Sequence, residues 1–117
     1  MEVIDKQINE VLKPKMAQCM EQDPKQTMAC LRANLPMLWS WGATKFEADK
    51  SLKVMRFFVR GRHHHGHVWI FLNGLDLFDF WLSTPQGRIK AEVTGLYFDQ
   101  LAEEIDKAVE YIPEYNY

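Results

Sequence analysis

The dipeptide Asn73-Gly74, which separates two apolar runs, constrains the fold of this chain more than any other part of its sequence. The runs are residues 68–72 and 75–82. Asn-Gly between such runs is the strongest short-range signal for a β-hairpin, because a type I′ turn needs positive φ at both central positions. The sequence therefore predicts two antiparallel strands joined by a two-residue turn, with Leu72 opposite Leu75.

This register divides the predicted hairpin into an aliphatic face and an aromatic face. A sheet with one solvated side alternates apolar and polar residues, and these two strands do not alternate in that way. We therefore expect the aliphatic face to pack under helices and the aromatic face to meet something else. The aliphatic face holds Val68, Ile70, Leu72, Leu75 and Leu77, and the aromatic face holds His67, Trp69, Phe71, Phe78 and Phe80.

Three further segments are predicted to extend the sheet. Residues 37–41 resemble a first strand closed by Gly42, and residues 52–60 a second strand. After a turn at residues 84–87, residues 88–93 alternate between apolar and charged side chains, as expected of a half-buried outer strand. The result is a meander of four or five antiparallel strands. The apolar side of the last strand consists of Ile89, Ala91 and Val93.

Helices are predicted at both ends of the chain. A first helix is kinked or ended by Pro14, and Asp23-Pro24 is typical of the N-cap and first position of a second helix, which Pro36 stops. The last helix starts near Phe98 or Asp99 and ends before Pro113, with acids opposite its apolar stripe. The apolar stripes are Ile4, Ile8, Val11 and Leu12 in the first helix, Met28 and Leu31 in the second, and Leu101, Ile105, Ala108, Val109 and Ile112 in the last.

These elements predict one α+β domain over residues 1–117. The expected architecture has two layers: an N-terminal helix or helices, a four- to five-stranded antiparallel meander, and a C-terminal helix packed on the sheet. The helix must lie on the sheet, because an amphipathic helix this short is marginally stable alone in water. A chain of 117 residues is long enough to bury one core of this kind.

The aromatic face of the predicted sheet is the candidate binding surface. Helices of the same chain, a second copy of the chain or a ligand can cover it, because a monomer rarely leaves so large an apolar patch bare. We expect a non-catalytic binding protein that uses this face for a protein partner or for self-association, with Trp69, Phe71 and Phe78 as anchors. The predicted binding residues are Arg56, Phe58, Arg60, Arg62, His67, Trp69, Phe71 and Phe78.

Single-stranded nucleic acid is the alternative partner for the same face. Bases stack on aromatic rings and phosphates pair with arginines, and residues 51–75 contain basic residues but no acid. The net charge of −2, Asp76 on the same face and the absence of an RNP-type sequence oppose this alternative. Attraction between the acidic last helix and the sheet, or between two copies of the chain, is another explanation of the uneven charge.

The run His63-His64-His65-Gly66-His67 is the candidate for metal binding. In an extended chain, His63, His65 and His67 point to the same side, and imidazole binds zinc, copper and nickel. A structural zinc site usually needs four ligands, and no accompanying Cys or Glu motif is present. We therefore predict a solvated loop or an interface contact, with no metal and no cofactor.

The sequence contains no motif of a catalytic site. Asp76 and Asp79 would lie on opposite faces of their strand, and the serine-hydrolase, phosphate-loop and dinucleotide motifs are absent. Cys19 and Cys30, both expected in helices, are too few for a secreted disulfide scaffold, so we expect reduced thiols in a cytoplasm. No signal peptide or membrane-spanning segment is predicted. We therefore expect neither an enzyme nor a small-molecule ligand, and a metal-dependent enzyme is the least favoured alternative.

Three short stretches of the chain resemble small uncharacterised proteins encoded by bacterial phages and mobile elements. The stretches are residues 39–42 (Trp-Ser-Trp-Gly), residues 72–78, and residues 95–99 followed by Ile105-Asp106, so the resemblance covers the last two-thirds of the chain. The family has no assigned activity, and the resemblance therefore assigns no role to any residue. It implies a bacterial cytoplasm and a role in maintaining the element or in blunting host defence.

Overall fold

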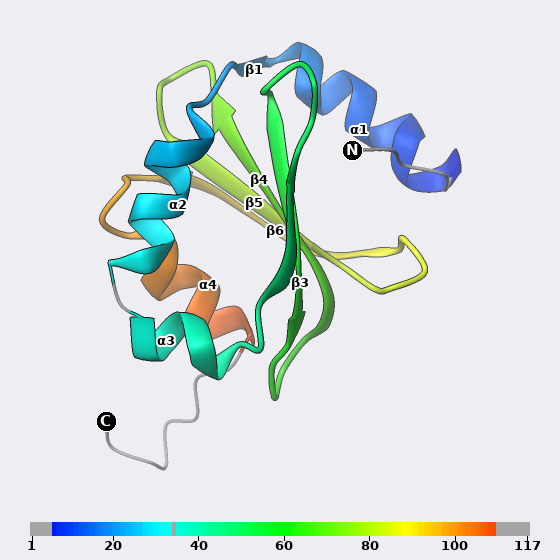
Figure 1. The fold of residues 1–117 in the computed structure, drawn as a ribbon. Helices are drawn as coiled ribbons and strands as arrows, with labels where there is room; N and C mark the ends of the chain where they lie inside the picture. Colours follow the sequence, from blue (N-terminus) through cyan, green and yellow to red (C-terminus); the bar gives the residue numbers. More distant parts are fainter. Residues whose placement is uncertain (1–5, 34, 110–117) are drawn as a thin grey trace.

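The computed structural model describes residues 6–33 and 35–109, which form helices on both faces of an antiparallel sheet (Figure 1). In chain order the elements are α1 (Lys6–Ala17), β1 (Cys19–Met20), α2 (Pro24–Arg32), α3 (Leu35–Ser40), β2 (Thr44–Ala48), β3 (Val54–Arg60), β4 (His65–Asn73), β5 (Phe78–Ser83), β6 (Ile89–Leu96) and α4 (Leu101–Val109).

Strands β2 to β6 form a meander in which each strand pairs with its neighbour in sequence, and β1 adds a short antiparallel pairing to β4. Helices α2, α3 and α4 lie on one face of the sheet, and α1 lies on the other (Figure 1). The predicted α+β fold, with N-terminal helices, an antiparallel meander and a C-terminal helix packed on the sheet, is confirmed.

The larger hydrophobic core lies between the sheet and helices α2 to α4. Leu31 of α2 and Leu101, Ile105 and Val109 of α4 pack onto the side chains that β3, β4 and β5 direct to this face. Trp41, which follows α3, is fully buried in the same core, and its Nε1 donates a hydrogen bond to Asp106 of α4 at 2.9 Å. The sheet residues of this core are Met55, Phe57, Val59, Val68, Ile70, Phe78, Phe80, Leu82 and Leu96.

A second cluster lies on the opposite face, under α1. Ile8 and Leu12 of α1 pack against Trp69, Phe71 and Trp81 of the sheet. Trp69 is 1% exposed and Phe71 is fully buried. Helices of the same chain, a second copy or a ligand were the three expected ways to cover the aromatic face. For Trp69 and Phe71 the cover is a helix of the same chain.

An ion pair fastens α1 to the sheet. Nζ of Lys15 lies 2.6 Å from Oδ2 of Asp79, whose side chain is 4% exposed, and 5.5 Å from the centre of the Phe71 ring. The other carboxylate oxygen of Asp79 accepts hydrogen bonds from Nδ2 of Asn73 and from the backbone N–H of Gly95, each at 2.9 Å. A buried carboxylate needs such partners, and here they join α1, β5, the β4–β5 loop and β6.

The predicted two-residue turn of the central hairpin is wrong. The connection is the four-residue loop 74–77 between β4 and β5, closed by a hydrogen bond from the N–H of Asn73 to the carbonyl of Leu77. Oδ1 of Asn73 accepts from the N–H groups of Leu75 and Leu77, so the side chain organises a wider loop than a type I′ turn. The residue with positive φ is Asp76, at 63°.

The wider loop shifts the register, so that Leu72 lies opposite Phe78 and not opposite Leu75. A shift by an odd number of residues exchanges the two faces of one strand. Phe78 and Phe80 consequently belong to the core under α2–α4, and Trp81 takes their expected place beside Phe71.

The predicted first strand over residues 37–41 is also wrong, because residues 37–40 belong to α3 and Trp41 lies in the turn that follows it. Pro36 lies in the first turn of α3, where a missing N–H costs little; it does not end α2, which already ends at Arg32. Leu38 and Trp41, three residues apart, are buried while Trp39 is exposed, which is the spacing of a helix and not of a strand. The actual first strand of the meander, β2, was not predicted.

Other boundaries differ from the sequence analysis in smaller ways. The first helix continues through Pro14 to Ala17, and Cys19 lies in β1 and not in a helix. Strand β3 begins at Val54, because Leu52 has a φ of 60° in the preceding turn. A register shift in β6 places Ile89 in the α1 cluster and Val93 in the larger core, so they do not share one face.

The N-cap of α2 is confirmed, since the side chain of Asp23 accepts from the N–H of Lys25. Helix α4 begins at Leu101, and its predicted buried residues Leu101, Ile105 and Val109 are confirmed. The predictions for Ile4 and Ile112 lie outside the described residues.

Candidate functional site

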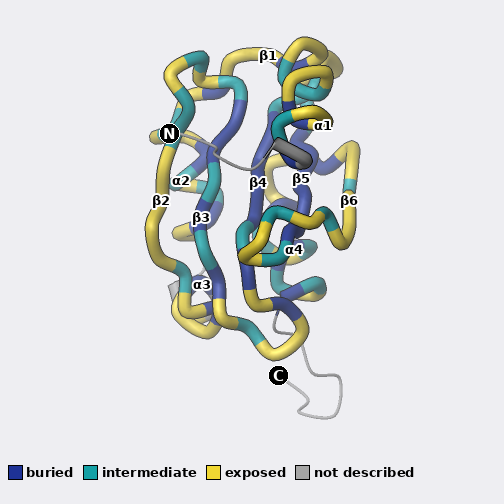
Figure 2. The backbone as a smooth tube through the Cα atoms, turned by 90° about the vertical axis from the view of Figure 1, so that its right-hand side faces the viewer, coloured by how far each residue is buried: buried dark blue, intermediate teal, exposed yellow. Residues whose placement is uncertain are grey.

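A basic aromatic surface remains on the sheet beyond the reach of α1. We define it by Lys45 of β2, Arg56, Phe58 and Arg60 of β3, and His65 and His67 of β4. Figure 2 looks onto this face and shows α1 on the side of β5 and β6; among the described residues, no helix lies in front of β2 and β3. This surface contains four of the predicted binding residues: Arg56, Phe58, Arg60 and His67.

Phe58 lies at the centre of the basic aromatic surface. The rings of His65 and His67 meet it edge-on, with centroids 5.3 and 5.2 Å away. Nζ of Lys45 lies over the Phe58 ring at 5.7 Å from its centroid, and the guanidinium of Arg60 at 6.0 Å. Cations attracted by the π-face of an aromatic ring are held close to it, so positive charge and an aromatic ring occupy one small area.

Arg56 extends this arrangement along β3. Its guanidinium lies 5.1 Å from the ring centre of Trp69 and pairs with Glu47 of β2 at 2.7 Å. Burial, together with the charges of Arg56 and Lys45, lowers the pKa of His67 to about 4. His67 is consequently a neutral ring at neutral pH.

The other predicted binding residues are not part of this exposed surface, although Trp69 lies directly beneath Arg56. Trp69 is covered, and its Nε1 donates to Oγ of Ser83 at 2.8 Å. Phe71 lies under α1, and Phe78 lies in the core on the opposite face. Arg62 is exposed in the turn between β3 and β4. Their role in binding a partner stays a prediction.

The histidine run forms no metal-ligand cluster. His64 is 2% exposed; its Nε2 donates to the carbonyl of His67 at 3.1 Å, and its Nδ1 accepts from Nζ of Lys90 at 3.3 Å. Burial lowers the pKa of His64, which fits this neutral tautomer. Within residues 6–33 and 35–109, no three His, Cys, Asp or Glu side chains are grouped to hold a metal ion.

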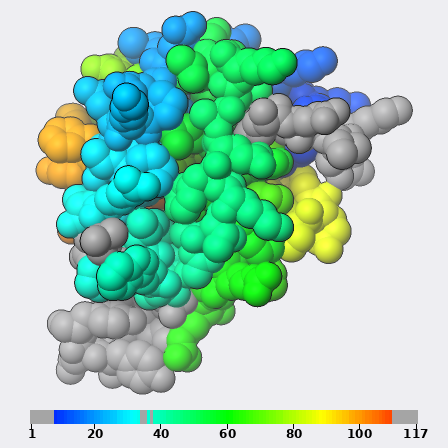
Figure 3. Space-filling view, viewed as in Figure 1, coloured from blue at the N-terminus to red at the C-terminus, as the bar shows by residue number. Residues whose placement is uncertain are grey.

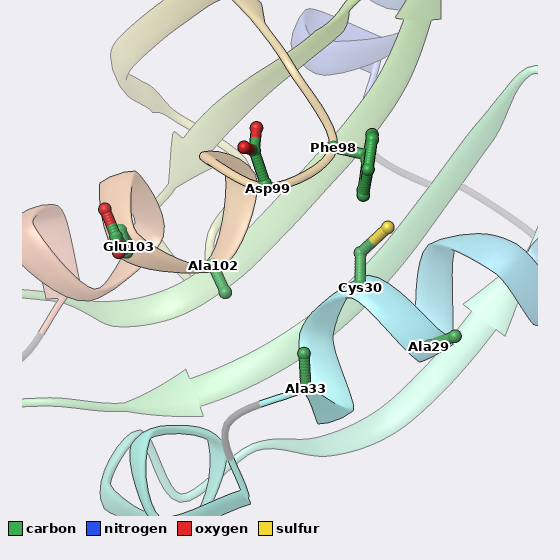
Figure 4. A pocket seen from close by; sticks show the side chains of 7 residues that line it. All are labelled: Ala29, Cys30, Ala33, Phe98, Asp99, Ala102 and Glu103. Atoms are coloured by element: carbon green, nitrogen blue, oxygen red, sulfur yellow. The ribbon is translucent and has the colours of Figure 1, made fainter.

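A groove runs along α2 on the other side of the molecule, and we call it the α2 groove. It consists of two adjoining cavities of about 660 and 380 Å³, which share Ala29, Cys30 and Phe98 in their lining. Figure 4 shows the smaller cavity, where the sulfur of Cys30 points toward Phe98. One wall is α2, and the others are the β4–β5 loop, the 97–100 turn and α4.

Three large apolar side chains beside the α2 groove are open to solvent. Leu75 is 80% exposed, Phe98 is 68% exposed and Tyr97 is 62% exposed. In Figure 3 the orange atoms of the segment before α4 stand out at the edge of the molecule beside the cyan atoms of α2. Large apolar side chains grouped in this way mark interaction sites on protein surfaces.

The charge of the α2 groove has one sign. Asp23, Asp76, Asp99 and Glu103 line it, and its described lining contains no lysine or arginine. Burial raises the pKa of the Cys30 thiol, so this cysteine is not an activated nucleophile. The groove therefore combines apolar anchors with a negative rim and has no group prepared for covalent chemistry.

The wall of the groove next to β4 is fixed by buried hydrogen bonds. Nε2 of Gln22 donates to the carbonyl of Ile70 at 2.9 Å, and Oε1 of Gln22 accepts from Oγ1 of Thr27 at 2.8 Å. These bonds anchor the start of α2 to the sheet, so the groove is formed before any partner arrives.

Sequence reasoning missed the α2 groove because it placed Leu75 in a strand and Phe98 at the start of a helix. Both residues lie in loops, where burial in the core is not required. The signal available in the sequence was the position of large apolar residues close after a glycine, Leu75 next to Gly74 and Phe98 three residues after Gly95.

The edges of the sheet are poor sites for adding another strand. In β2 the register shifts between Thr44 and Glu47, and Lys45 has a φ of 56°. In β6 the register shifts opposite Phe78–Phe80 and Leu82–Ser83, and Gly95 has a φ of 75°. Bulges and edge lysines hinder edge-to-edge pairing, so the basic aromatic surface and the α2 groove are stronger candidates for binding than the edges of the sheet.

No helix in the described part of the chain is long and apolar enough to cross a membrane. The chain matches no protein-family model, no curated protein and no solved structure.

Proposed function

We propose that this protein is a non-catalytic binding protein and that it docks a basic amphipathic helix of a protein partner in the α2 groove. The observation that carries this proposal is the group of exposed apolar side chains, Leu75, Tyr97 and Phe98, beside a preformed groove. Amphipathic helices bind proteins by placing their apolar face in such grooves.

The walls of the α2 groove favour a helix as the occupant. Ala29 of α2, Ala33 at the C-cap of α2 and Ala102 of α4 present small side chains to the cavity (Figure 4). Small residues allow the backbone of another helix to approach closely, and neighbouring helices pack at about 8–10 Å between axes. The larger side chains of Phe98 and Leu75 then contact the apolar face of the incoming helix.

Charge complementarity favours a basic partner. An incoming helix with lysine or arginine beside its apolar stripe meets Asp23, Asp76, Asp99 and Glu103 along the groove. Charge pairing across an interface contributes to specificity and to the association rate. An acidic helix of equal hydrophobicity is repelled by the same residues.

This proposal keeps the predicted class of function and moves its location. Trp69 and Phe71 bind α1 within the chain, so the anchors proposed for a partner are Leu75 and Phe98. The resemblance to phage and mobile-element proteins supplies the proposed setting, a bacterial cytoplasm, in which the partner belongs to the element or to its host.

Binding to a model helix tests this proposal. The probe is an 18-residue amphipathic peptide with leucine on one face and lysine on the other, and its counterpart has glutamate in place of lysine. We expect the lysine peptide to shift the amide resonances of Ala29, Cys30 and Ala102, and the glutamate peptide to leave them unchanged. Absence of shifts with the lysine peptide, or equal shifts with both peptides, contradicts the proposal.

Matched variants separate the groove from the rest of the surface. Phe98→Ala and Leu75→Ala each remove an exposed side chain and are expected to weaken binding of the lysine peptide by about tenfold or more, since truncation of an interface anchor costs about 2 kcal/mol. Trp39→Ala removes another exposed ring, 71% accessible and outside the groove, and serves as the control. If the protein forms a salt-resistant dimer and Phe98→Ala dissociates it, a second copy of the chain occupies the α2 groove. That result would overturn the proposal of a basic partner.

A further inference from the structure

The basic aromatic surface is independent of the α2 groove and lies on the other face of the sheet. We propose that it binds single-stranded nucleic acid, with Phe58 stacking on a base and Lys45 and Arg60 contacting phosphates. The protein then has two binding surfaces, one for a protein helix and one for a polyanion.

The charge of this surface is opposite to that of the whole chain. Lys45, Arg56 and Arg60 lie within contact distance of two rings, and Glu47 is the acid that pairs with one of them. The chain as a whole has a net charge of −2. Positive charge concentrated on one face of an acidic protein directs a polyanion to that face.

The ring of Phe58 supplies a stacking platform at the centre of these charges. Lys45 and Arg60 lie over its π-face through long side chains whose residues are both exposed. When a base stacks on the ring, these side chains can turn outward to the phosphates on either side of it. Stacking on an aromatic ring accepts any base, so little sequence preference is expected.

His65 and His67 define the border of the platform. Both meet Phe58 edge-on and hold its ring in place. His67 is neutral at neutral pH because its pKa is about 4, and it can exchange hydrogen bonds with a base edge without adding charge.

The shape of the surface selects single strands over duplexes. It is part of a sheet, and the backbone spans only about 13 Å between Arg56 and Arg60 at the usual rise of a strand. A sheet face with a central ring stacks bases that are splayed out of a helix, as single strands allow. A duplex hides the faces of its bases and presents none to Phe58.

Fluorescence anisotropy with a labelled dT12 oligonucleotide tests the inference, with an abasic 12-mer and a 12-residue glutamate peptide as comparison probes. We expect dT12 to bind with a log–log salt slope of about −1.4 for two phosphate contacts, which is a loss of roughly sevenfold from about 50 to about 200 mM salt. The abasic strand is expected to bind about tenfold or more weakly, because it lacks stacking. An rU12 strand tests whether DNA and RNA differ.

Three variants assign the binding to this surface. Arg60→Ala and Lys45→Ala each reduce the salt slope by about 0.7, whereas Lys107→Ala, an exposed lysine on α4, leaves it unchanged. Phe58→Leu keeps an apolar side chain and is expected to weaken dT12 about tenfold while leaving the abasic strand unaffected. Circular dichroism confirms that each variant is folded.

Three outcomes overturn the inference. Equal affinity for dT12, the abasic strand and the glutamate peptide identifies a surface that attracts any anion, and tight binding of the glutamate peptide alone identifies an acidic protein segment. A salt slope that Arg60→Ala and Lys45→Ala leave unchanged places the nucleic acid elsewhere. None of these results affects the peptide test of the α2 groove, so the two proposals fail separately.

Discussion

Replacement of Lys15 by methionine tests whether the buried ion pair holds α1 against the sheet. Lys15→Met keeps most of the aliphatic length of the side chain and removes its charge. It leaves Oδ2 of Asp79 without its partner at 2.6 Å, while Oδ1 retains the donors from Asn73 and Gly95. The carboxylate therefore stays in an apolar environment with only one of its oxygens hydrogen-bonded.

The size of the effect follows from these contacts. Removal of one partner from a buried pair usually costs about 3–5 kcal/mol. Two considerations reduce this figure: Oδ1 keeps two donors, and the Lys15 side chain is 15% exposed, so water reaches the vacated position. We expect the free energy of unfolding to fall by about 2–3 kcal/mol, a large part of the about 5–15 kcal/mol of an ordinary domain.

Urea denaturation followed by tryptophan fluorescence measures this loss, and a double-mutant cycle isolates the pair. Asp79→Asn alone also destabilises the protein, and the double variant Lys15→Met with Asp79→Asn no longer buries an unpaired charge. We expect a coupling energy of at least about 1.5 kcal/mol between the two positions.

Purely additive effects, with a coupling below about 0.5 kcal/mol, would refute this reasoning. In that case the side chains of Ile8 and Leu12 alone would hold α1 on the sheet. Lys13→Met, which changes an exposed lysine of the same helix, controls for the general effect of lost positive charge.

Three further predictions concern stability. His67 is protonated below about pH 6.5 in the unfolded chain but only below about pH 4 in the folded chain. The contribution of His67 to the free energy of unfolding is therefore fully present above pH 6.5 and falls by about 1–2 kcal/mol toward pH 4, after allowance for solvent screening. Urea titrations at each pH should show that His67→Gln removes this part of the loss. Gly66→Ala would place a Cβ 2.1 Å from the carbonyl oxygen of Ser83, so thermal unfolding should show that the free energy of unfolding falls by several kcal/mol. In the control variant Gly74→Ala the nearest atom to the new Cβ is 3.6 Å away, and this variant should melt close to the original temperature. Leu12→Ala empties the space under α1 and should cost about 2–5 kcal/mol in urea denaturation; a loss below about 1 kcal/mol would mean that this side chain is not packed as described.

The order of the central elements could be predicted from the sequence, but the pairing of their residues could not. Hydrophobic runs and Asn73-Gly74 are local signals, and they located β4 and β5. The register of the hairpin depends on whether Asn73 lies in a tight two-residue turn or organises a wider loop with its side chain. The wider loop forms because the Asn73 side chain bonds the backbone of Leu75 and also the carboxylate of Asp79. Asp79 lies in β5, beyond the loop, and the preference of Asn-Gly for tight turns takes no account of this contact.

The candidate sites show the same division between local and tertiary information. Arg56, Phe58, Arg60 and His67 share a surface as predicted, because alternation along β3 and its pairing with β4 follow from the sequence. The short segment around Trp39 has a composition that suits a strand, and only the burial of Leu38 and Trp41 against α2 and α4 makes it a helix. The α2 groove depends on loops that meet in space, so no periodicity predicts it.

The irregular edges of the sheet also bear on how the protein behaves when it is concentrated. The register shifts in β2 and β6, with Lys45 at the edge of one and Gly95 in the other, interrupt the row of backbone groups that another copy would need for a continuous ladder. Fibrils grow by such ladders. Although its strands are rich in apolar residues, the chain can therefore avoid fibril formation at high concentration. Its apolar grooves can stay open to solvent without leading to polymerisation through the strands.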